Sequence, residues 1–202
     1  MERPLRIGIL ALQGCVEPHV PHLNALGVQV IIVRSAPDFA NINALILPGG
    51  ESTVQLKLLG LLELEEVFLK CCSRIPVWGI CAGAILMALN VSNPPQKSYR
   101  LIDIDIERNS YGRQLDSFRA NVGGDPVAFI RAPLVTRVGA GVTILESFEG
   151  IPVWLSNEQH MITTFHPELG PSFPSNIHRY FVERALRNSE LSHLPPGNSI
   201  QS

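Results

Sequence analysis

A cysteine between two glycines is the residue of this sequence best suited to covalent chemistry. Cys81 lies at the centre of the pentapeptide GICAG (79–83), after an apolar run and before a segment with helical periodicity. A G-x-nucleophile-x-G sequence between a strand and a helix is typical of a sharp, strained turn that exposes its central side chain. The start of a helix also favours the thiolate form of a cysteine. We therefore predict that Cys81 is a nucleophile; the alternative is a tight turn in which the cysteine only fills space.

A histidine and a glutamate two positions apart supply the partners that a nucleophilic thiol needs. His166 ends an apolar run, and Pro167 separates it from Glu168. An imidazole can pair with the thiolate and protonate a leaving group, and a carboxylate can fix the tautomer of that imidazole. A histidine at a strand end is by itself more often structural, but together with the Cys81 turn it favours a triad of Cys81, His166 and Glu168.

The other five histidines lack a carboxylate in so restrained a setting. They are His19, His22, His160, His178 and His193. For His19, on the first predicted helix, the sequence leaves open either a buried role or a role that faces a partner.

A glycine pair and two arginines are candidates for holding a ligand. In LPGGEST (47–53), Gly49 and Gly50 follow an apolar run, where glycines let the backbone approach a ligand and its N–H groups bind an anion. The alternative is a capped helix start at Glu51 or Ser52. Arg108 and Arg131 could each bind a carboxylate through two parallel hydrogen bonds; the alternative for each is a solvated surface charge.

These residues need a scaffold that brings distant segments together. In the first half of the chain, apolar runs alternate with amphipathic segments, which predicts a mainly parallel sheet covered by helices. We expect strands at 5–12, 28–33, 44–47 and 76–80, helices at 16–26 and 82–90, and two short helices within 51–72 separated at Gly60. Beyond residue 95 the segments are short strands, some antiparallel, until a last helix at 176–187.

The sequence therefore predicts one three-layer α/β domain over residues 1–188, with a mixed, mostly parallel sheet of flavodoxin-like type flanked by helices. Residues 189–202 have no periodicity, and we expect them to form a mobile tail. Since the carboxyl edge of such a sheet carries the functional site, we expect the candidate residues to meet there.

Composition excludes several classes of function. The chain has 202 residues, 46% of them hydrophobic and 17% charged, and a formal net charge of −2. That charge provides no electrostatic footprint for nucleic acid, and no apolar run approaches the roughly 20 residues that span a membrane. The four cysteines, Cys15, Cys71, Cys72 and Cys81, have neither metal-site spacing nor disulfide density. We expect a cytoplasmic protein with reduced thiols and no metal, in which Cys71 and Cys72 are buried as small apolar residues.

The motifs together resemble a known family. GICAG followed by a distant HPE resembles the class I, triad-type glutamine amidotransferases. LALQG, LPGGEST, ERNSYGRQLDSF and FIRAP narrow the resemblance to the glutaminase subunits of pyridoxal 5′-phosphate synthase, from about Ile7 to the last helix. The resemblance implies hydrolysis of L-glutamine to L-glutamate and ammonia through a γ-glutamyl thioester on Cys81, without a cofactor.

The resemblance also assigns roles to individual residues. The backbone N–H groups of Gly50, or Gly49, and of Ala82 would bind the oxyanion. The implied substrate contacts are Gly49, Gly50, Glu51, Ser52, Arg108, Ile130 and Arg131. Two departures are Ile80, where the family commonly has threonine, and Cys15, where it has alanine. The segment 117–133 is also several residues shorter than in the family, which implies a trimmed strand or hairpin before Arg131.

A partner is implied as well. In the family, ammonia passes to a synthase subunit that makes pyridoxal 5′-phosphate for vitamin B6 biosynthesis, and docking completes the oxyanion hole. We expect Gln13, in the LALQG turn, and His19 to be docking candidates. Two alternatives stay open: the glutaminase of another amidotransferase, such as the histidine-pathway enzyme, and a non-catalytic binding module of the same fold.

Overall fold

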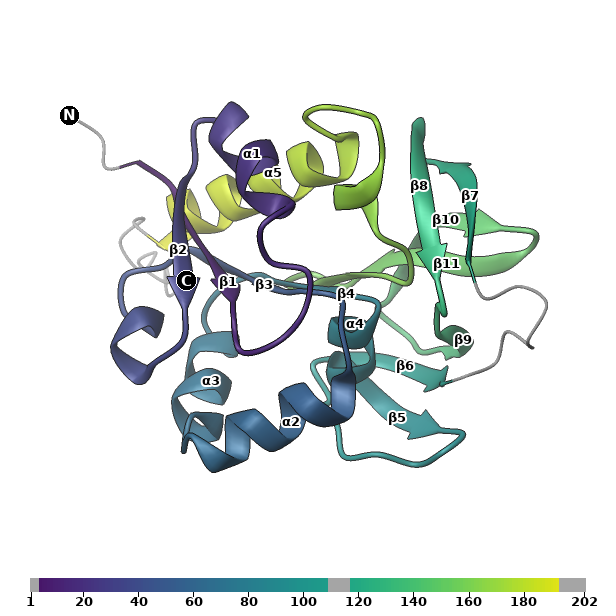
Figure 1. Cartoon of the computed structure of the whole chain (residues 1–202), viewed down its shortest axis with the longest axis horizontal. Coiled ribbons are helices and arrows are strands. Elements are labelled where there is room, and N and C mark those ends of the chain that lie inside the picture. The colour runs from purple at the N-terminus through teal and green to yellow at the C-terminus, as the bar shows by residue number, and fades with distance from the viewer. Residues whose placement is uncertain (1–3, 109–116, 193–202) are drawn as a thin grey trace, which may run out of the picture.

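A seven-stranded sheet forms the centre of the molecule (Figure 1). The computed structural model describes residues 4–108 and 117–192. The sheet has the strand order β10-β11-β12-β4-β3-β1-β2, and the five strands from β12 to β2 pair in parallel. Their bounds are β1 Arg6–Leu10, β2 Gln29–Val33, β3 Ala44–Leu47, β4 Val77–Ile80 and β12 Met161–Thr163. Antiparallel pairing adds β11 (Ile151–Ser156) and β10 (Thr143–Phe148), so the sheet is mixed and mostly parallel, as predicted.

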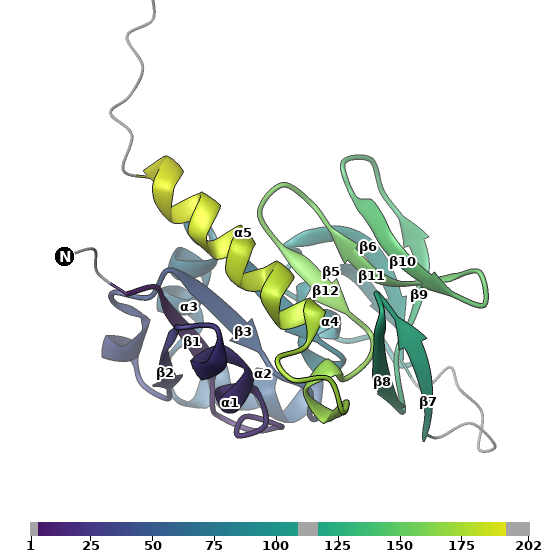
Figure 2. The same cartoon turned by 90° about the horizontal axis from the view of Figure 1, so that it is seen from above.

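Helices cover both faces of this sheet, which gives the predicted three layers (Figures 1 and 2). On one face lie α1 (His19–Ala25) and α5 (Asn176–Ser192). On the other lie α2 (Ser52–Leu61), α3 (Glu65–Cys72) and α4 (Ala82–Met87). Two short 3-10 helices, η1 (Ala36–Phe39) and η2 (Pro167–Leu169), complete the helical elements of the described residues.

Each face of the sheet has its own apolar core, because the central strands are buried on both sides. Phe68 of α3 packs in one core with Cys71 and Cys72, which are buried as predicted. Trp78 of β4 and Phe181 of α5 pack in the other. The fully buried strand β3, with the sequence ALIL, separates the two cores and shows why its apolar run is continuous rather than alternating.

In the second half of the chain, the described residues form strands and, apart from the 3-10 helix η2, no helix until α5, as expected. A three-stranded sheet contains β5 (Ala88–Ser92), β6 (Ile102–Glu107) and β9 (Leu134–Val138). A separate hairpin contains β7 (Ser117–Val122) and β8 (Asp125–Ile130). An isolated antiparallel bridge between the backbones of Ala128 and His166 joins the hairpin to the segment that follows β12 of the central sheet.

Several predicted boundaries were wrong. Helix α4 ends at Met87, not at residue 90, because the next five residues pair with β6 instead. Gly60 lies inside α2; the break comes three residues later, where Glu63 has a positive φ of 55°. Helix α1 starts at His19 rather than at residue 16.

The last helix is also longer than predicted: α5 continues to Ser192 rather than ending at residue 187, so residues 189–192 are helical and not part of a tail. No Pro or Gly occurs in 188–192 to stop the helix. Residues 193–202 lie outside the described residues, as does most of the RNSYGRQLDSF motif, at 109–116. Over 4–108 and 117–192, no helix combines the length and the apolar character that crossing a membrane requires.

Candidate active site

Four adjacent parallel strands deliver the candidate residues to one edge of the sheet. The neighbours β12, β4, β3 and β1 end at Thr163, Ile80, Leu47 and Leu10, respectively. His166, Cys81, the Gly49–Gly50 pair and Gln13 follow these four ends in the same order. Because parallel strands have their carboxyl ends at the same edge, residues far apart in the chain meet there.

Cys81 occupies a strained turn between β4 and α4. Its φ is 48° and its ψ is −99°, a backbone conformation that costs a non-glycine residue on the order of 1–3 kcal/mol. The backbone N–H of Cys81 donates to the carbonyl of Thr163 at 2.8 Å, which fixes the turn to β12. A Cβ on Gly79 would lie 2.6 Å from Met87 Sδ, and one on Gly83 would overlap the carbonyl oxygen of Leu47. The predicted glycine requirement therefore comes from close packing on both sides of the cysteine.

His166 and Glu168 form the expected pair at the end of β12. Nδ1 of His166 lies 2.7 Å from Oε1 of Glu168, and both side chains are almost fully buried. Burial opposes a charged imidazole, but hydrogen bonds and charge attraction to Cys81 and Glu168 outweigh it and raise the pKa of His166 to about 10. Burial likewise opposes the Glu168 carboxylate, but His19 and His166 outweigh it and lower the pKa of Glu168.

A pocket of about 300 Å³ opens beside the sulfur of Cys81. It is lined by Gln13, Gly14, Cys15, Gly49, Gly50, Glu51, Ser52, Cys81, Ala82, Ile85, Arg108, Ile130, Arg131, Pro133, His166 and Leu169. All seven residues expected to contact a substrate are in this set. Glu168 is not, since it lies behind the imidazole of His166. The pocket is large enough for a single small polar molecule.

The glycine turn after β3 lies directly against the imidazole. A Cβ on Gly49 would overlap the His166 ring, so only glycine fits at that position. The carbonyl of Gly49 accepts the backbone N–H of Cys15 at 2.8 Å, which fixes the Gly49–Gly50 peptide plane. The neighbouring Gly50 lines the pocket with its backbone, as an oxyanion donor must.

Charged side chains lie at the mouth of the pocket. Nη2 of Arg131 is 3.0 Å from Oε1 of Glu51, and both side chains are exposed. An exposed pair of this kind contributes little to stability, so a ligand can compete for either partner at small cost. The hydroxyl of Ser52 is instead buried and donates to Oε1 of Gln96 at 2.9 Å.

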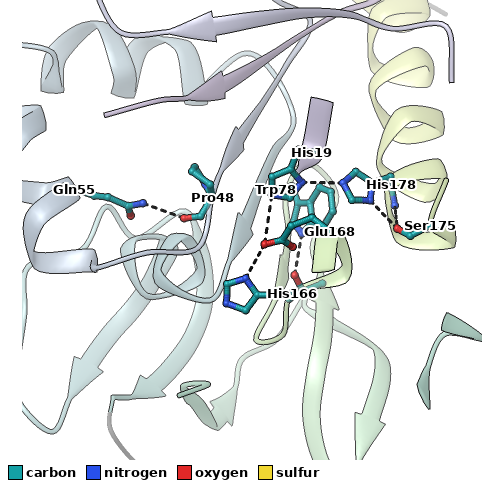
Figure 3. A network of polar contacts seen from close by, with 9 residues as sticks. His19, Pro48, Gln55, Trp78, His166, Glu168, Ser175 and His178 are labelled. Atoms are coloured by element: carbon teal, nitrogen blue, oxygen red, sulfur yellow. Dashed lines mark hydrogen bonds and ion pairs between the residues drawn. The ribbon is translucent and has the colours of Figure 1, made fainter. Parts of the chain in front are cut away.

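Two glutamines build this edge, and the sequence reasoning did not assign them there. Gln13 was expected at a docking surface, but it lines the pocket, and its Oε1 accepts the N–H of Glu51 at 2.9 Å. Gln55, which was not singled out, is buried and donates to the carbonyl of Gln13 at 2.9 Å. It also donates to the carbonyl of Pro48 at 3.0 Å (Figure 3). A signal for Gln55 was present, since it shares the buried face of α2 with Ser52 and Leu59.

The side chain of His19 does not reach the protein surface. Its side chain is 0% exposed and lies between Glu168 and His178 (Figure 3). The expectation of a docking role for this side chain is therefore wrong for the structure described, and the buried alternative holds. Burial lowers the pKa of His19 to about 4, so the ring is neutral near pH 7.

Cys15, where the resembled family has alanine, lines the pocket together with Cys81 and His166. Burial and the neighbouring charge of Glu168 raise the pKa of Cys15 to about 11, which keeps this thiol protonated. Within 4–108 and 117–192, His, Cys, Asp and Glu side chains form no group of three that could hold a metal ion. Cys81 and His166 line one pocket, and Glu168 bonds to the imidazole, so the site can support the chemistry of a cysteine nucleophile with an imidazole partner.

Known proteins match nearly the whole of this chain. Residues 9–187 match the model of the SNO glutamine amidotransferase family. The pyridoxal 5′-phosphate synthase subunit PdxT of Solibacter usitatus is 41% identical, covering 89% of this chain and 98% of the relative. The PdxT of Dehalococcoides mccartyi is 42% identical, covering 90% and 97%. A crystal structure of a glutamine amidotransferase superposes with a TM-score of 0.80 at 36% identity, over 89% of this chain and 98% of that one. The chain thus belongs to the SNO glutamine amidotransferase family.

Proposed function

We propose that this chain is the glutaminase subunit of a pyridoxal 5′-phosphate synthase, with L-glutamine as its substrate. The observation that carries the proposal is the meeting of Cys81, His166 and the Gly49–Gly50 turn around one small pocket, with Glu168 bonded to the imidazole. The PdxT name of relatives at about 40% identity supports the choice of synthase over another amidotransferase. The intact nucleophile and base argue against a non-catalytic binding module.

The pocket mouth suits the amino-acid end of glutamine. Arg131 can bind the α-carboxylate of glutamine. Glu51, the ion-pair partner of Arg131 in the free chain, can accept hydrogen bonds from the α-ammonium group. Arg108 and the backbone of Ile130 line the same pocket and would complete the contacts. The side-chain amide of glutamine then points inward to the sulfur of Cys81.

The reaction follows from this placement. The Cys81 thiolate attacks the amide carbon, and the oxyanion that forms is stabilised by the N–H groups of Gly50 and Ala82. His166 gives its proton to the amide nitrogen, the C–N bond breaks, and ammonia leaves a γ-glutamyl thioester on Cys81. A water molecule then attacks the thioester while His166 takes its proton. The C–S bond breaks and releases glutamate, and the thiolate–imidazolium pair is restored.

The proposal also includes a partner subunit that consumes the ammonia. Ammonia that escapes into water is protonated and ceases to be a nucleophile, so the proposal includes docking on a synthase subunit that receives it and makes pyridoxal 5′-phosphate. Gln13 remains a candidate for sensing this docking, because it lines the pocket and accepts from the backbone of Glu51. A rearrangement of the turn that holds Gln13 would act directly on the substrate site.

Ammonia release from L-glutamine tests both parts of the proposal. We expect slow release by the chain alone, faster release with a matching synthase subunit, and none with Cys81→Ala. Turnover by Cys81→Ala within a few fold of the unmodified chain would overturn the assignment of the nucleophile. Equal rates with and without the synthase would instead contradict only the coupling.

A further inference from the structure

A network of buried polar side chains lies behind the candidate triad: Glu168, His19, His178 and Ser175 (Figure 3). None of these four residues lines the pocket. Oε1 of Glu168, which pairs with His166, is also 3.8 Å from Nε2 of His19. Nδ1 of His19 is 2.8 Å from Nε2 of His178. Nδ1 of His178 is 2.7 Å from the hydroxyl of Ser175. His19, His178 and Ser175 are all 0% exposed, so solvent cannot complete their hydrogen bonds.

The protonation state of each ring and the nearest acceptor decide where the protons lie in this network. Burial lowers the pKa of His19 to about 4 and that of His178 well below its usual value, so each ring is neutral and carries a single N–H. An unprotonated Nε2 on His19 would turn its lone pair toward the Glu168 carboxylate, which is repulsive. A proton on that Nε2 leaves Nδ1 to accept from Nε2–H of His178, and Nδ1 of His178 then accepts from the Ser175 hydroxyl.

We propose that His19 is a positioning residue of the triad, whose Nε2–H, aligned by His178 and Ser175, holds the Glu168 carboxylate ionised and directed at His166. The 3.8 Å separation is too long for a direct hydrogen bond, but an N–H dipole acts strongly on a carboxylate where no water screens it. Because His19 is neutral, it does not compete as a cation with His166 for the carboxylate. The inference rests on the proposed function and adds a residue to its machinery.

The surroundings hold both rings in place. The ring of Trp78 packs edge-on against His19 and His178, with centroid distances of 5.8 and 5.0 Å. The ring of His22 stacks on His178 at 4.3 Å, and its Nδ1 accepts the backbone N–H of Ser175 at 3.2 Å. Among the described residues, Nε2 of His19 has no hydrogen-bond partner and Oε2 of Glu168 has none either. Nε2 of His19 therefore has no acceptor that competes with the Glu168 carboxylate, whose Oε1 lies 3.8 Å away.

Nitrogen-15 NMR of the full chain at neutral pH tests the direction of the protons without any substrate. We expect His19 and His178 to be neutral, each with its proton on Nε2. A proton on Nδ1 of His19, or a charged His19 ring, would overturn the proposal. This measurement stands whether or not the chain releases ammonia, so its failure is distinct from a failure of the proposed function.

Kinetics of the complex with a synthase subunit test the effect on catalysis. His19→Leu removes the N–H but keeps a side chain of similar volume. We expect kcat to fall about tenfold, which corresponds to the free energy of one hydrogen bond, and KM to stay unchanged. His19→Gln places an amide N–H near the same position and should keep most of kcat. His160→Asn is the control, because His160 is also buried but bonds to the backbone of Val77 instead. Equal losses in the Gln and Leu variants, or a similar loss in the control, would contradict a positioning role.

Discussion

At the scale of single residues, the site depends on groups held in states that they would not adopt alone. Cys81 is held at a positive φ of 48°, and His166 is held as a buried cation by the charges around it. Both states are stabilised by neighbours: Thr163 fixes the backbone of Cys81, and Glu168 pairs with His166 at 2.7 Å. Neighbouring residues thus set the backbone of Cys81 and the charge of His166 before any ligand binds, and such preorganisation spares reorganisation during a reaction.

The role of Glu168 leads to the first residue-scale prediction. In Glu168→Gln the shape is kept, but the negative charge that stabilises and orients the His166 imidazolium is lost. We expect kcat for ammonia release to fall roughly 10²- to 10⁴-fold, the range seen for proton-transfer groups and their orienting carboxylates. KM should change little, since Glu168 does not line the pocket. A kcat within threefold of the unmodified chain would show that the imidazole needs no orienting carboxylate.

At the scale of elements, the turn between β4 and α4 depends on a glycine, Gly83, that is closely packed, whereas the helical glycine Gly60 has open space around it. Gly83 lies where a Cβ would overlap a backbone atom of Leu47, which cannot move aside as a side chain could. Gly60, inside α2, has no atom within 4 Å of the position of a Cβ. The two residues form a matched pair for testing how tightly the turn is packed.

We predict opposite signs for alanine at these two glycines. Gly83→Ala should lower the free energy of unfolding by about 3 kcal/mol or more, because backbone must shift to relieve the overlap. Gly60→Ala should raise it by about 0.5–1 kcal/mol, since alanine is the better helix former. Urea denaturation followed by circular dichroism measures both. Equal effects in the two variants would contradict the packing described for the turn.

The elements also show where sequence reasoning was sufficient. Runs such as ALIL in β3 and VWGI in β4 are short, fully buried and bounded by turn residues, so their strands were predictable. The boundary at Ala88 was not, because nothing in ILMALN stops a helix; pairing of the next residues with β6 overrides the local preference. The end of α5 was missed for a related reason, since polar residues without Pro or Gly can extend a helix.

At the scale of the whole molecule, the buried histidines make stability depend on pH. Burial lowers the pKa of His19 and His160 to about 4 and lowers those of His22 and His178 as well. Unfolded histidines titrate near 6.5, so between pH 6.5 and 4 the unfolded chain binds more protons than the folded one. Stability from these groups is therefore present above pH 6.5 and lost as the pH falls toward 4.

His160 provides a test of this dependence away from the site. His160→Asn keeps an acceptor for the backbone N–H of Val77, which Nδ1 now accepts at 3.2 Å, but removes the titrating ring. Between pH 7 and pH 4, the unmodified chain should lose up to roughly 3 kcal/mol more free energy of unfolding than the variant. Parallel losses in the two proteins would show that His160 does not resist protonation in the fold.

The whole molecule also sets the limit of what the sequence alone could provide. The residues of the proposed triad could be singled out because each stands in a short motif at the end of an apolar run. The contact of His19 with His178 joins residues 159 positions apart, and no motif marks it. Only the packing of α1 against α5 over Trp78 brings these rings together, and that packing is a property of the assembled layers.

We expect Cys81, rather than the Cys15 thiol that lines the same pocket, to carry the covalent intermediate. The chain offers its own control, because Cys15 lines the same pocket but is held protonated beside Glu168. The direct measurement is mass spectrometry of peptides after reaction of the synthase complex with a glutamine-like electrophile. We predict modification of Cys81, little of Cys15, and a large slowing in His166→Gln. Modification of Cys15 with Cys81 untouched, at full loss of ammonia release, would contradict the account.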